Sequence, residues 1–191
     1  MRTEQHGAAS LFALSHIPMK FSDVIQARQS VRSFLPDPIP EPLLQKILSC
    51  LACVPSAGNL QAYEILRLRK PDLKARLGEA TTACAAPVRQ APIALIFIAN
   101  AFRSGLKYQE RGINLFCVQD ATIAATYVML AAVDHGLATL WIGGFNTAEV
   151  STLLELKPGL WPVVIMPIGF PAEVPERRAR RSLQDVVHDL D

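Results

Sequence analysis

The hydrophobic residues of this chain follow two periods, one helical and one strand-like. After Pro40 the apolar side chains recur at helical spacing, so that Leu44, Ile47 and Leu51 share one face and predict a helix through Cys53. An unbroken apolar run over residues 92–99, rich in isoleucine, predicts a strand buried on both faces. The same patterns predict helices over residues 22–28, 72–80 and 147–156, the first capped by Ser22 and the last by Thr147, and strands over residues 63–69, 138–142 and 163–170.

Residues 119–135 form the longest predicted helix, which has almost no polar face. A helix that is apolar all round must be covered on every side. One small domain does not easily provide that cover, so we expect a second subunit to bury part of this helix. Gly136 then follows as a left-handed cap, and His135 is expected to cap the helix or join the core rather than act as a base.

The order of helices and strands indicates an α+β fold of packed layers around one core. A chain of 191 residues is long enough for one domain with a sizeable core. We assign residues 21–191 to that domain and residues 1–20 to a loose N-terminal extension, within which Met19 is an alternative start. Residues 101–114 are polar and contain glycine, which predicts a loop or a short helix that covers a site.

Composition argues against several classes of function. The chain has 19 Lys and Arg residues and 17 Asp and Glu residues, and its net charge of +2 is too small to favour nucleic acid or a membrane surface as a partner. No unbroken apolar run reaches the roughly 20 residues that a membrane-spanning helix needs. The N-terminal residues lack the pattern of a secretion signal. The four cysteines, at positions 50, 53, 84 and 117, do not form a disulfide framework in a chain of this length, so we expect a cytoplasmic protein.

Cys50 and Cys53 have the C-x-x-C spacing of redox and zinc sites, but no second Cys or His pair accompanies them and no strand leads into them. We expect both to be buried helix residues that behave as small hydrophobes, and we expect no metal site. The four histidines are isolated, and the sequence contains no hydrolase motif, dinucleotide-binding glycine motif or phosphate-binding loop. Any phosphate must therefore be bound by side chains.

Four segments carry candidate chemistry. The 28–34 segment, RQSVRSF, places two arginines around a serine, and arginine makes planar, bidentate contacts with phosphate and with carbonyl-rich rings. The 55–61 segment, PSAGNLQ, combines small residues that let a ligand approach the backbone with two amide side chains that donate and accept hydrogen bonds. A strand-like run ends at Gly143 and Gly144, and the 177–181 segment, RRARR, is the densest positive charge. Taken alone, the first segment is equally compatible with a solvated basic turn.

In order and spacing these segments resemble the nitroreductase family of FMN-dependent oxidoreductases, in particular its short-chain branch. The resemblance extends over residues 21–187 and is supported by KYQERG at residues 107–112 and QDA at residues 119–121. It implies a three-layer α+β fold with a central, mixed and mostly antiparallel sheet flanked by helices. It also implies an intertwined homodimer with flavin sites at the interface. One departure is Ala62 followed by Tyr63, where members often have proline and then an aromatic residue.

The resemblance also implies roles for individual residues. The 28–32 segment would hold the FMN phosphate and the pyrimidine edge of the flavin, the 55–61 segment would reach the ring, and the 142–144 backbone would lie against it. The implied cofactor-binding residues are Arg28, Gln29, Ser30, Arg32, Pro55, Ser56, Asn59, Gln61, Ile142, Gly143, Gly144, Arg178, Arg180 and Arg181. Which of the last three arginines completes the phosphate site stays open. Tyr63, Tyr108 and Arg111 are assigned to the substrate pocket.

By this resemblance the chain is expected to take a hydride from NADH or NADPH and to reduce nitroaromatic, quinone or related acceptors by a ping-pong mechanism. The flavin carries the chemistry, so no catalytic side chain is assigned. Two alternatives stay open. One is different flavin chemistry on the same fold, such as reductive dehalogenation or flavin breakdown. The other is a regulatory module that binds FMN without turnover.

Overall fold

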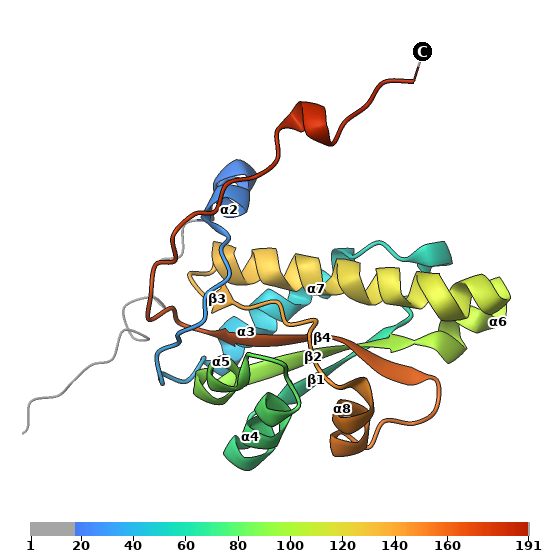
Figure 1. Ribbon diagram of the computed structural model, residues 1–191, viewed down its shortest axis with the longest axis horizontal. Coiled ribbons are helices and arrows are strands. Elements are labelled where there is room, and N and C mark those ends of the chain that lie inside the picture. The colour runs from blue at the N-terminus through green and yellow to red at the C-terminus, as the bar shows by residue number, and fades with distance from the viewer. Residues whose placement is uncertain (1–17, 191) are drawn as a thin grey trace, which may run out of the picture.

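A four-stranded sheet lies at the centre of the computed structural model, which describes residues 18–190. The strands lie in the order β1 (Tyr63–Leu68), β2 (Ile93–Asn100), β4 (Leu160–Gly169) and β3 (Ala138–Thr139). Each neighbouring pair is antiparallel, and within residues 18–190 parallel pairing is limited to one bridge between Ser30 and Thr139. Helices cover both faces of the sheet (Figure 1), which confirms the expected α+β fold.

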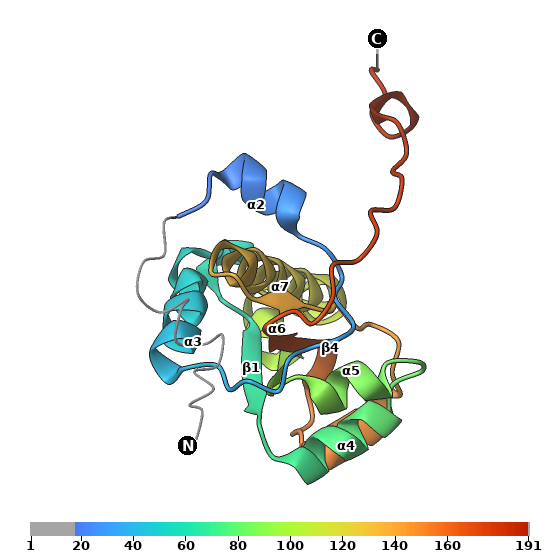
Figure 2. The ribbon, with the colours of Figure 1, turned by 90° about the vertical axis from the view of Figure 1, so that its left-hand side faces the viewer.

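Alternate residues of β2 point to two different helical layers. Leu95 and Phe97 pack on one face with α3 (Glu41–Leu48) and α7 (Cys117–Asp134). Ile96 and Ile98 pack on the other face with α4 (Pro71–Glu79), α5 (Ala85–Gln90) and α8 (Thr147–Leu153). Figure 2 shows α7 and α4 on opposite sides of the sheet. The strand is buried along its length except at Asn100, because it has a helical layer on each side.

The predicted all-apolar helix is α7, which begins two residues earlier than expected, at Cys117. Val128 and Ala132 are fully buried against the sheet, whereas Tyr127 is 37% exposed. Together with the helices before it, α7 forms the segment Ala101–Asp134, whose length and mean hydropathy of 1.5 over 18 residues would suit a membrane span. The segment contains no unbroken apolar run of that length, so the sequence did not predict a membrane span. Packing of α7 against the sheet accounts for part of its apolar composition, since 39% of this window is buried within the chain.

The C-terminal end of α7 forms as the sequence predicts. His135 is the C-cap residue, and Gly136 is left-handed with a φ of 73°. The Leu137 N–H donates to the Ala132 carbonyl at 2.8 Å. The Gly136 N–H donates to the Val133 carbonyl at 3.0 Å, which completes a Schellman motif.

The segment predicted as a loop or short helix is the helix α6 (Ala101–Arg111), which is kinked at Gln109 and is followed by a π-helical turn, η3 (Gly112–Phe116). The polar composition of α6 misled the prediction, because most of its residues face solvent. A Cβ on Gly112 would lie 2.5 Å from the Ser104 carbonyl oxygen, so glycine permits close packing at this junction. Gly112 therefore permits the close packing of this junction and does not interrupt the helical segment.

Other predicted boundaries were wrong by smaller amounts. The helix after Pro40 ends at Leu48 and continues to Cys53 only as a 3₁₀ turn, η1 (Ser49–Cys53). Ser22 does not cap α2 (Phe21–Ala27). Asn146, not Thr147, caps α8. Its side-chain oxygen accepts from the backbone N–H groups of Ala148 at 3.1 Å and Glu149 at 3.2 Å. The six-residue helix α5 was not predicted, and β3 is shorter than the strand predicted over residues 138–142.

The C-terminal tail, residues 171–190, runs beside the 33–35 segment and then leaves the body of the molecule. Phe34 and Pro171 form an antiparallel bridge, and the Ala172 N–H donates to the Ser33 carbonyl at 3.0 Å. Beyond this the tail passes α2 and projects away from the sheet (Figures 1 and 2), with one 3₁₀ turn, η4 (Leu183–Asp185). The predicted N-terminal extension lies outside the described residues except for residues 18–20, and the single-domain assignment stays a prediction.

Candidate functional site

The 28–34 segment leaves α2 as an extended chain tied to the sheet. The Val31 N–H donates to the Thr139 carbonyl at 3.1 Å. Val31 and Phe34 anchor the segment, since both are buried in the core at 5% exposure, while the Arg32 side chain faces solvent. The polar residues between and before these two anchors are left on the outer side of the segment.

The tail returns over this outer side and, besides its backbone bridge to Phe34, is held there by the side chains of Glu173 and Arg177. Glu173 Oε1 accepts from the backbone N–H groups of Arg32 at 2.6 Å and Ser33 at 3.1 Å. Further along the tail, the Arg177 guanidinium donates to the Gln26 carbonyl at 2.5 Å. Two segments that are about 150 residues apart in the sequence are thereby brought together.

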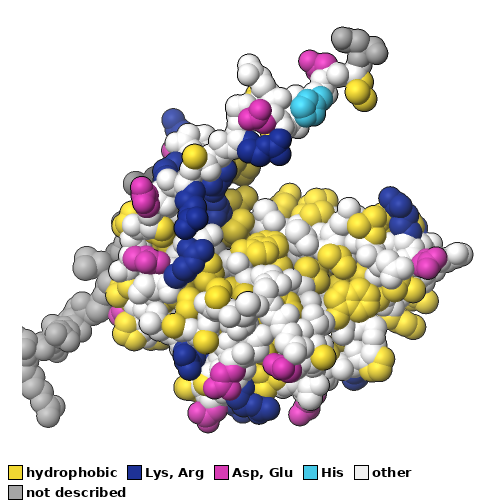
Figure 3. All heavy atoms as spheres, in the orientation of Figure 1, with side chains coloured by type: hydrophobic (Ala, Val, Ile, Leu, Met, Phe, Trp, Pro, Cys, Tyr) yellow, Lys and Arg dark blue, Asp and Glu magenta, His cyan; other side chains and the backbone are white. Residues whose placement is uncertain are grey.

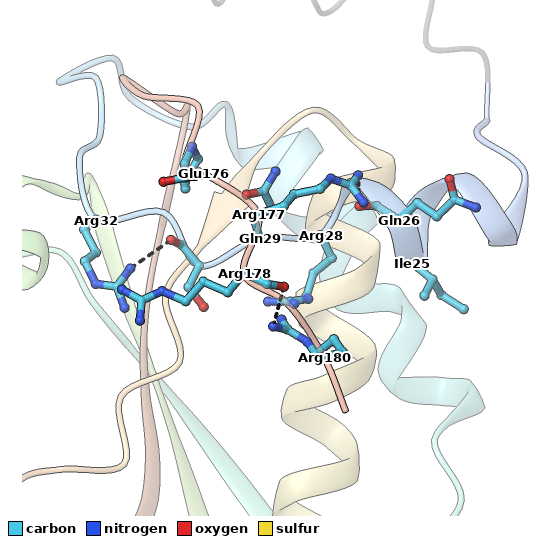
Figure 4. A pocket seen from close by; sticks show the side chains of 11 residues that line it. Ile25, Gln26, Arg28, Gln29, Arg32, Glu176, Arg177, Arg178 and Arg180 are labelled. Carbon is cyan, nitrogen blue, oxygen red and sulfur yellow. Dashed lines mark hydrogen bonds between the residues drawn. The ribbon is translucent and has the colours of Figure 1, made fainter. Parts of the chain in front are cut away.

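The two segments enclose an open cavity of about 470 Å³, which we name the arginine pocket. Figure 4 shows its side chains, and Figure 3 shows the same basic residues gathered along the tail and the neighbouring segment. Five arginines and one glutamate are among its lining residues, so it carries a strong excess of positive charge. The pocket is lined by Ile25, Gln26, Arg28, Gln29, Ser30, Arg32, Pro175, Glu176, Arg177, Arg178 and Arg180.

The arginines of this pocket are not neutralised by carboxylates among residues 18–190. Their described hydrogen bonds go to backbone carbonyls: Arg32 to Ser30 at 3.3 Å, and Arg180 to Arg178 at 3.0 Å. Several like charges held close together without counterions repel one another. An anion with several oxygens, such as a phosphate, would relieve this repulsion and accept bidentate hydrogen bonds. The pocket therefore fits the phosphate end of a nucleotide cofactor.

The structure places the predicted arginines unequally. Arg28, Arg32, Arg178 and Arg180 line the pocket together with the predicted Gln29 and Ser30. The Arg181 guanidinium instead donates to the Asp185 carbonyl, next to the capping box formed by Ser182 and Asp185, and is not among the lining residues. Sequence reasoning did not assign Arg177 or Glu173 to the site. Arg177 lies within the basic run and was accessible from the sequence, whereas nothing local distinguishes Glu173.

The 55–61 segment folds into a tight loop around the 3₁₀ turn η2 (Ala57–Asn59). Gly58, Asn59 and Gln61 all adopt positive φ angles, of 56°, 59° and 50°. Such angles are rare for residues other than glycine. They turn the exposed Asn59 and Gln61 amides toward each other, and Gln61 Nε2 donates to Asn59 Oδ1 at 3.3 Å. The loop thus presents two amide groups side by side.

Asp120, in the first turn of α7, holds both ends of this loop. It is 2% exposed, and its two carboxylate oxygens accept from the Ala57 N–H at 2.9 Å and the Ala62 N–H at 3.2 Å. Sequence reasoning did not assign Asp120 to the site. The signal was present, since Asp120 is an acidic residue near the start of a largely apolar helix, and a buried acid in such a position needs hydrogen-bond donors.

Helix α6 packs its polar end against the same loop. A Cβ on Gly58 would lie 2.5 Å from the Tyr108 hydroxyl and 2.7 Å from the Lys107 ammonium, so both side-chain tips touch the loop backbone. Tyr63, the other tyrosine assigned to the substrate pocket, is half-buried at the edge of the core, and its hydroxyl lies 3.5 Å from the Leu51 carbonyl. Burial, with Asp120 and Cys50 nearby, raises the pKa of the Tyr63 hydroxyl.

The segment after β3 supplies the remaining predicted residues. Ile142 is buried and exchanges two backbone hydrogen bonds of 3.0 Å with Ile165 of β4. Gly143 and Gly144 are exposed. A Cβ on Gly143 would meet only the Trp141 ring nitrogen, at 4.0 Å, so the backbone here is open to a ligand.

The arginine pocket and the 55–61 loop lie at opposite ends of α7 within one chain. Asp120 holds the loop at the start of this helix, whereas Asp134 at its end accepts from the Met19 N–H just before α2. The two aspartates are 14 positions apart along the helix, which corresponds to about 21 Å at 1.5 Å per residue. The structure therefore does not unite the predicted cofactor residues around one point of a single chain.

The cysteines differ from their predicted environment. Cys50 is half-buried and Cys53 is exposed, and both lie on the 3₁₀ turn η1, so the prediction of two buried helix cysteines was wrong. Burial, together with the nearby Cys53, raises the pKa of the Cys50 thiol to about 11. Within residues 18–190 no group of three or more His, Cys, Asp or Glu side chains is arranged to hold a metal ion.

The fold and the arginine pocket define an α+β protein equipped to bind a phosphorylated ligand through side chains. The sequence profile described as the nitroreductase family matches residues 25–91 and 82–170, and the chain belongs to this family. This confirms the resemblance seen in the motifs.

Individual relatives are similar over most of the chain. A Thermus thermophilus protein named NADH dehydrogenase is 28% identical over 187 residues, which cover 84% of this chain and 91% of the relative. An FMN reductase (NAD(P)H) of Bacillus subtilis is 28% identical over 174 residues, covering 84% of this chain and 69% of the relative. Among solved structures, the NADPH:FMN oxidoreductase of Vibrio harveyi complexed with NAD+ has a TM-score of 0.81 and 27% identity, over 88% of this chain and 76% of that one.

Proposed function

We propose that this chain is an NAD(P)H-dependent FMN oxidoreductase that reduces small acceptors such as nitroaromatics or quinones. The observation that carries the proposal is the arginine pocket, in which the 28–32 segment and the tail present unneutralised guanidinium groups on one cavity. The names of the relatives, an NADH dehydrogenase and an FMN reductase, support the same class of reaction. Bound FMN would supply the hydride and electron chemistry.

The residues of the chain then have binding and orienting roles. Arg28, Arg32 and the tail arginines would hold the phosphate, and their positive field would favour a negatively charged reduced cofactor. The Asn59 and Gln61 amides match the donors and acceptors on the edge of a flavin. In the overall reaction NAD(P)H loses a hydride, and a quinone gains two electrons and two protons, one of which comes from solvent.

The reaction is expected to proceed in two alternating half-reactions in one pocket. Initial rates measured against NADPH at several fixed quinone concentrations should give parallel double-reciprocal lines. Intersecting lines would contradict alternation and indicate that donor and acceptor bind together.

We further propose that the working form is a homodimer whose sites combine the arginine pocket of one copy with the 55–61 loop of the other. The separation of these two regions along α7 supports this arrangement, because one copy alone does not bring them together. Exposed apolar side chains support it as well. On α2 and the tail these are Phe21, Ile25, Val174, Leu183, Val186, Val187 and Leu190.

Mixing two inactive variants tests the shared site. Arg32→Ala should impair the pocket and Asn59→Ala the loop, and each homodimer should have low FMN affinity. If sites are shared, a mixed dimer has one doubly impaired site and one intact site, so refolding the two variants together should restore about a quarter of the wild-type sites. No restoration, with mixed dimers shown to form, would place each site within a single chain.

Four free cysteines at positions 50, 53, 84 and 117 agree with a cytoplasmic location, which we also propose.

A further inference from the structure

Four side chains at the end of α6 and in the following turn form a row of charges and rings, which we name the cation–aromatic lip. The Lys107 ammonium lies 5.4 Å from the centre of the Tyr108 ring. The Tyr108 and Phe116 rings meet edge to face, with centres 5.0 Å apart. The Arg111 guanidinium lies 5.3 Å from the centre of the Phe116 ring. A cation therefore flanks each end of an aromatic pair, at distances typical of cation–π contacts.

The lip borders the 55–61 loop. Lys107 and Tyr108 touch the loop at Gly58, directly before the Asn59 amide. The Arg103 guanidinium, one turn earlier in α6, donates to the Leu60 carbonyl and fixes the helix to the loop. A ligand that reaches the Asn59 amide would therefore lie within side-chain reach of the Lys107 ammonium.

The two cations of the lip are not used for structural ion pairs. Among residues 18–190, neither Lys107 nor Arg111 pairs with a carboxylate, although Glu110 lies between them in the sequence. Both side chains are exposed, so their charge is available to a ligand. This contrasts with Arg67 and Arg69, which both pair with Glu41.

The backbone of this region is also unusual. Gln109 has a φ of 49° and a ψ of −133° inside α6, and the next turn is π-helical. A residue in such a conformation is strained and persists only where its surroundings hold it. π-helical turns occur frequently at functional sites. The lip is therefore a built feature rather than the end of a regular surface helix.

We propose that the lip selects substrates that carry an anionic group on an aromatic framework. Its rings would stack on the aromatic part, and Lys107 and Arg111 would attract the anion. This inference rests on the proposed function and specifies its substrate class. The anion would be either a carboxylate on the acceptor or the 2′-phosphate that distinguishes NADPH from NADH, and the experiment separates these sources.

The test compares matched substrates on the FMN-loaded protein. The specificity constant is measured for 4-nitrobenzoate and for its neutral analogue 4-nitrobenzamide, and then for NADPH and NADH with a neutral quinone. The Lys107→Met and Arg111→Met variants each keep an apolar stem on the neighbouring ring but lose the charge. Lys46→Met, on the exposed side of α3, is the control for loss of one positive charge elsewhere.

Each lip variant should lower one of the two ratios, anionic to neutral acceptor or NADPH to NADH, by about fivefold, the upper range for a solvent-exposed charge pair. A fall in the first ratio identifies the acceptor as the source of the anion, and a fall in the second identifies the donor. High salt should reduce the same ratio in the unsubstituted protein, and Lys46→Met should change neither. If both ratios survive in both lip variants, the inference is wrong. Failure of the proposed function would look different, since the unsubstituted protein would then turn over no acceptor.

Discussion

Asp120 provides the sharpest test of how the 55–61 loop is held. Its carboxylate is 2% exposed and accepts hydrogen bonds from the Ala57 and Ala62 N–H groups. Replacing Asp120 with alanine leaves both donors without their partner. Ala62 is fully buried, so water cannot easily replace the carboxylate there, whereas Ala57 is only half-buried and can be rehydrated.

The structure sets the size of the expected effect. A buried donor left unsatisfied costs about 1–3 kcal/mol. With one donor fully buried and one partly rehydrated, Asp120→Ala should lower the free energy of unfolding by about 2–3 kcal/mol. That is a large fraction of the roughly 5–15 kcal/mol of a typical domain. Asp120→Asn retains one acceptor oxygen but points an NH₂ group at the second donor, so we expect about half this loss.

Two assays check the reasoning. Urea unfolding should show a lower midpoint at an unchanged slope, in the order wild type, Asp120→Asn, Asp120→Ala. If about 1.4 kcal/mol of the lost free energy is the cost of ordering the 55–61 loop, the affinity for FMN should fall about tenfold. This affinity is followed by flavin fluorescence. An Asp120→Ala protein with the wild-type midpoint and wild-type FMN affinity would refute the role assigned to this carboxylate.

Two further predictions concern the loop and the surface. Gly58→Ala places a Cβ at a φ of 56° and 2.5 Å from the Tyr108 hydroxyl, so it should destabilise the protein by about 1–2 kcal/mol and weaken FMN binding. Gly143→Ala is the control, because a Cβ there meets no obstruction and should leave the melting temperature nearly unchanged. Equal melting temperatures for the two variants would contradict the loop geometry. Hydrogen bonds from Gln45, Arg67 and Arg69 lower the pKa of Glu41 from 4.5 to about 2, so its stabilising contribution is complete above pH 4.5 and disappears as the pH falls through 2. The difference in urea midpoint between wild type and Glu41→Gln should therefore be larger at pH 7 than at pH 2.5. A difference that is larger at pH 2.5 would contradict a lowered pKa for Glu41.

The long, strongly patterned elements were predictable from the sequence. The 92–99 run became β2 because a strand between two helical layers must be apolar on both faces. Helix α7 was recognisable from its length and apolar residues, and Gly136 marked its end. By contrast, α5 has only six residues, too few to show a hydrophobic period. Helix α6 is amphipathic, but its polar composition and its glycine led to the prediction of a loop or short helix. The pattern of α6 was therefore available in the sequence, whereas α5 depends on tertiary packing that a local pattern does not encode.

The candidate site was likewise predictable from the sequence only in part. Arginine spacing at 28–32 and the basic run in the tail predicted two segments that the structure brings together. Glu173 contributes to their meeting by binding the backbone of the 32–33 segment, and a contact across about 140 residues leaves no local signal. The unequal roles of Arg178, Arg180 and Arg181 depend on the path of the tail, which the sequence does not specify. Roles in FMN binding stay predictions for all of these residues.

One measurement tests the proposed function most directly. Purified protein is loaded with FMN, made anaerobic and mixed with NADPH or NADH while the flavin absorbance is followed. We predict that the flavin bands bleach with at least one donor and return when a quinone is added, in step with its reduction. If bound FMN keeps its absorbance with both donors, the chain binds the cofactor without using it for hydride transfer, and the enzymatic account is wrong.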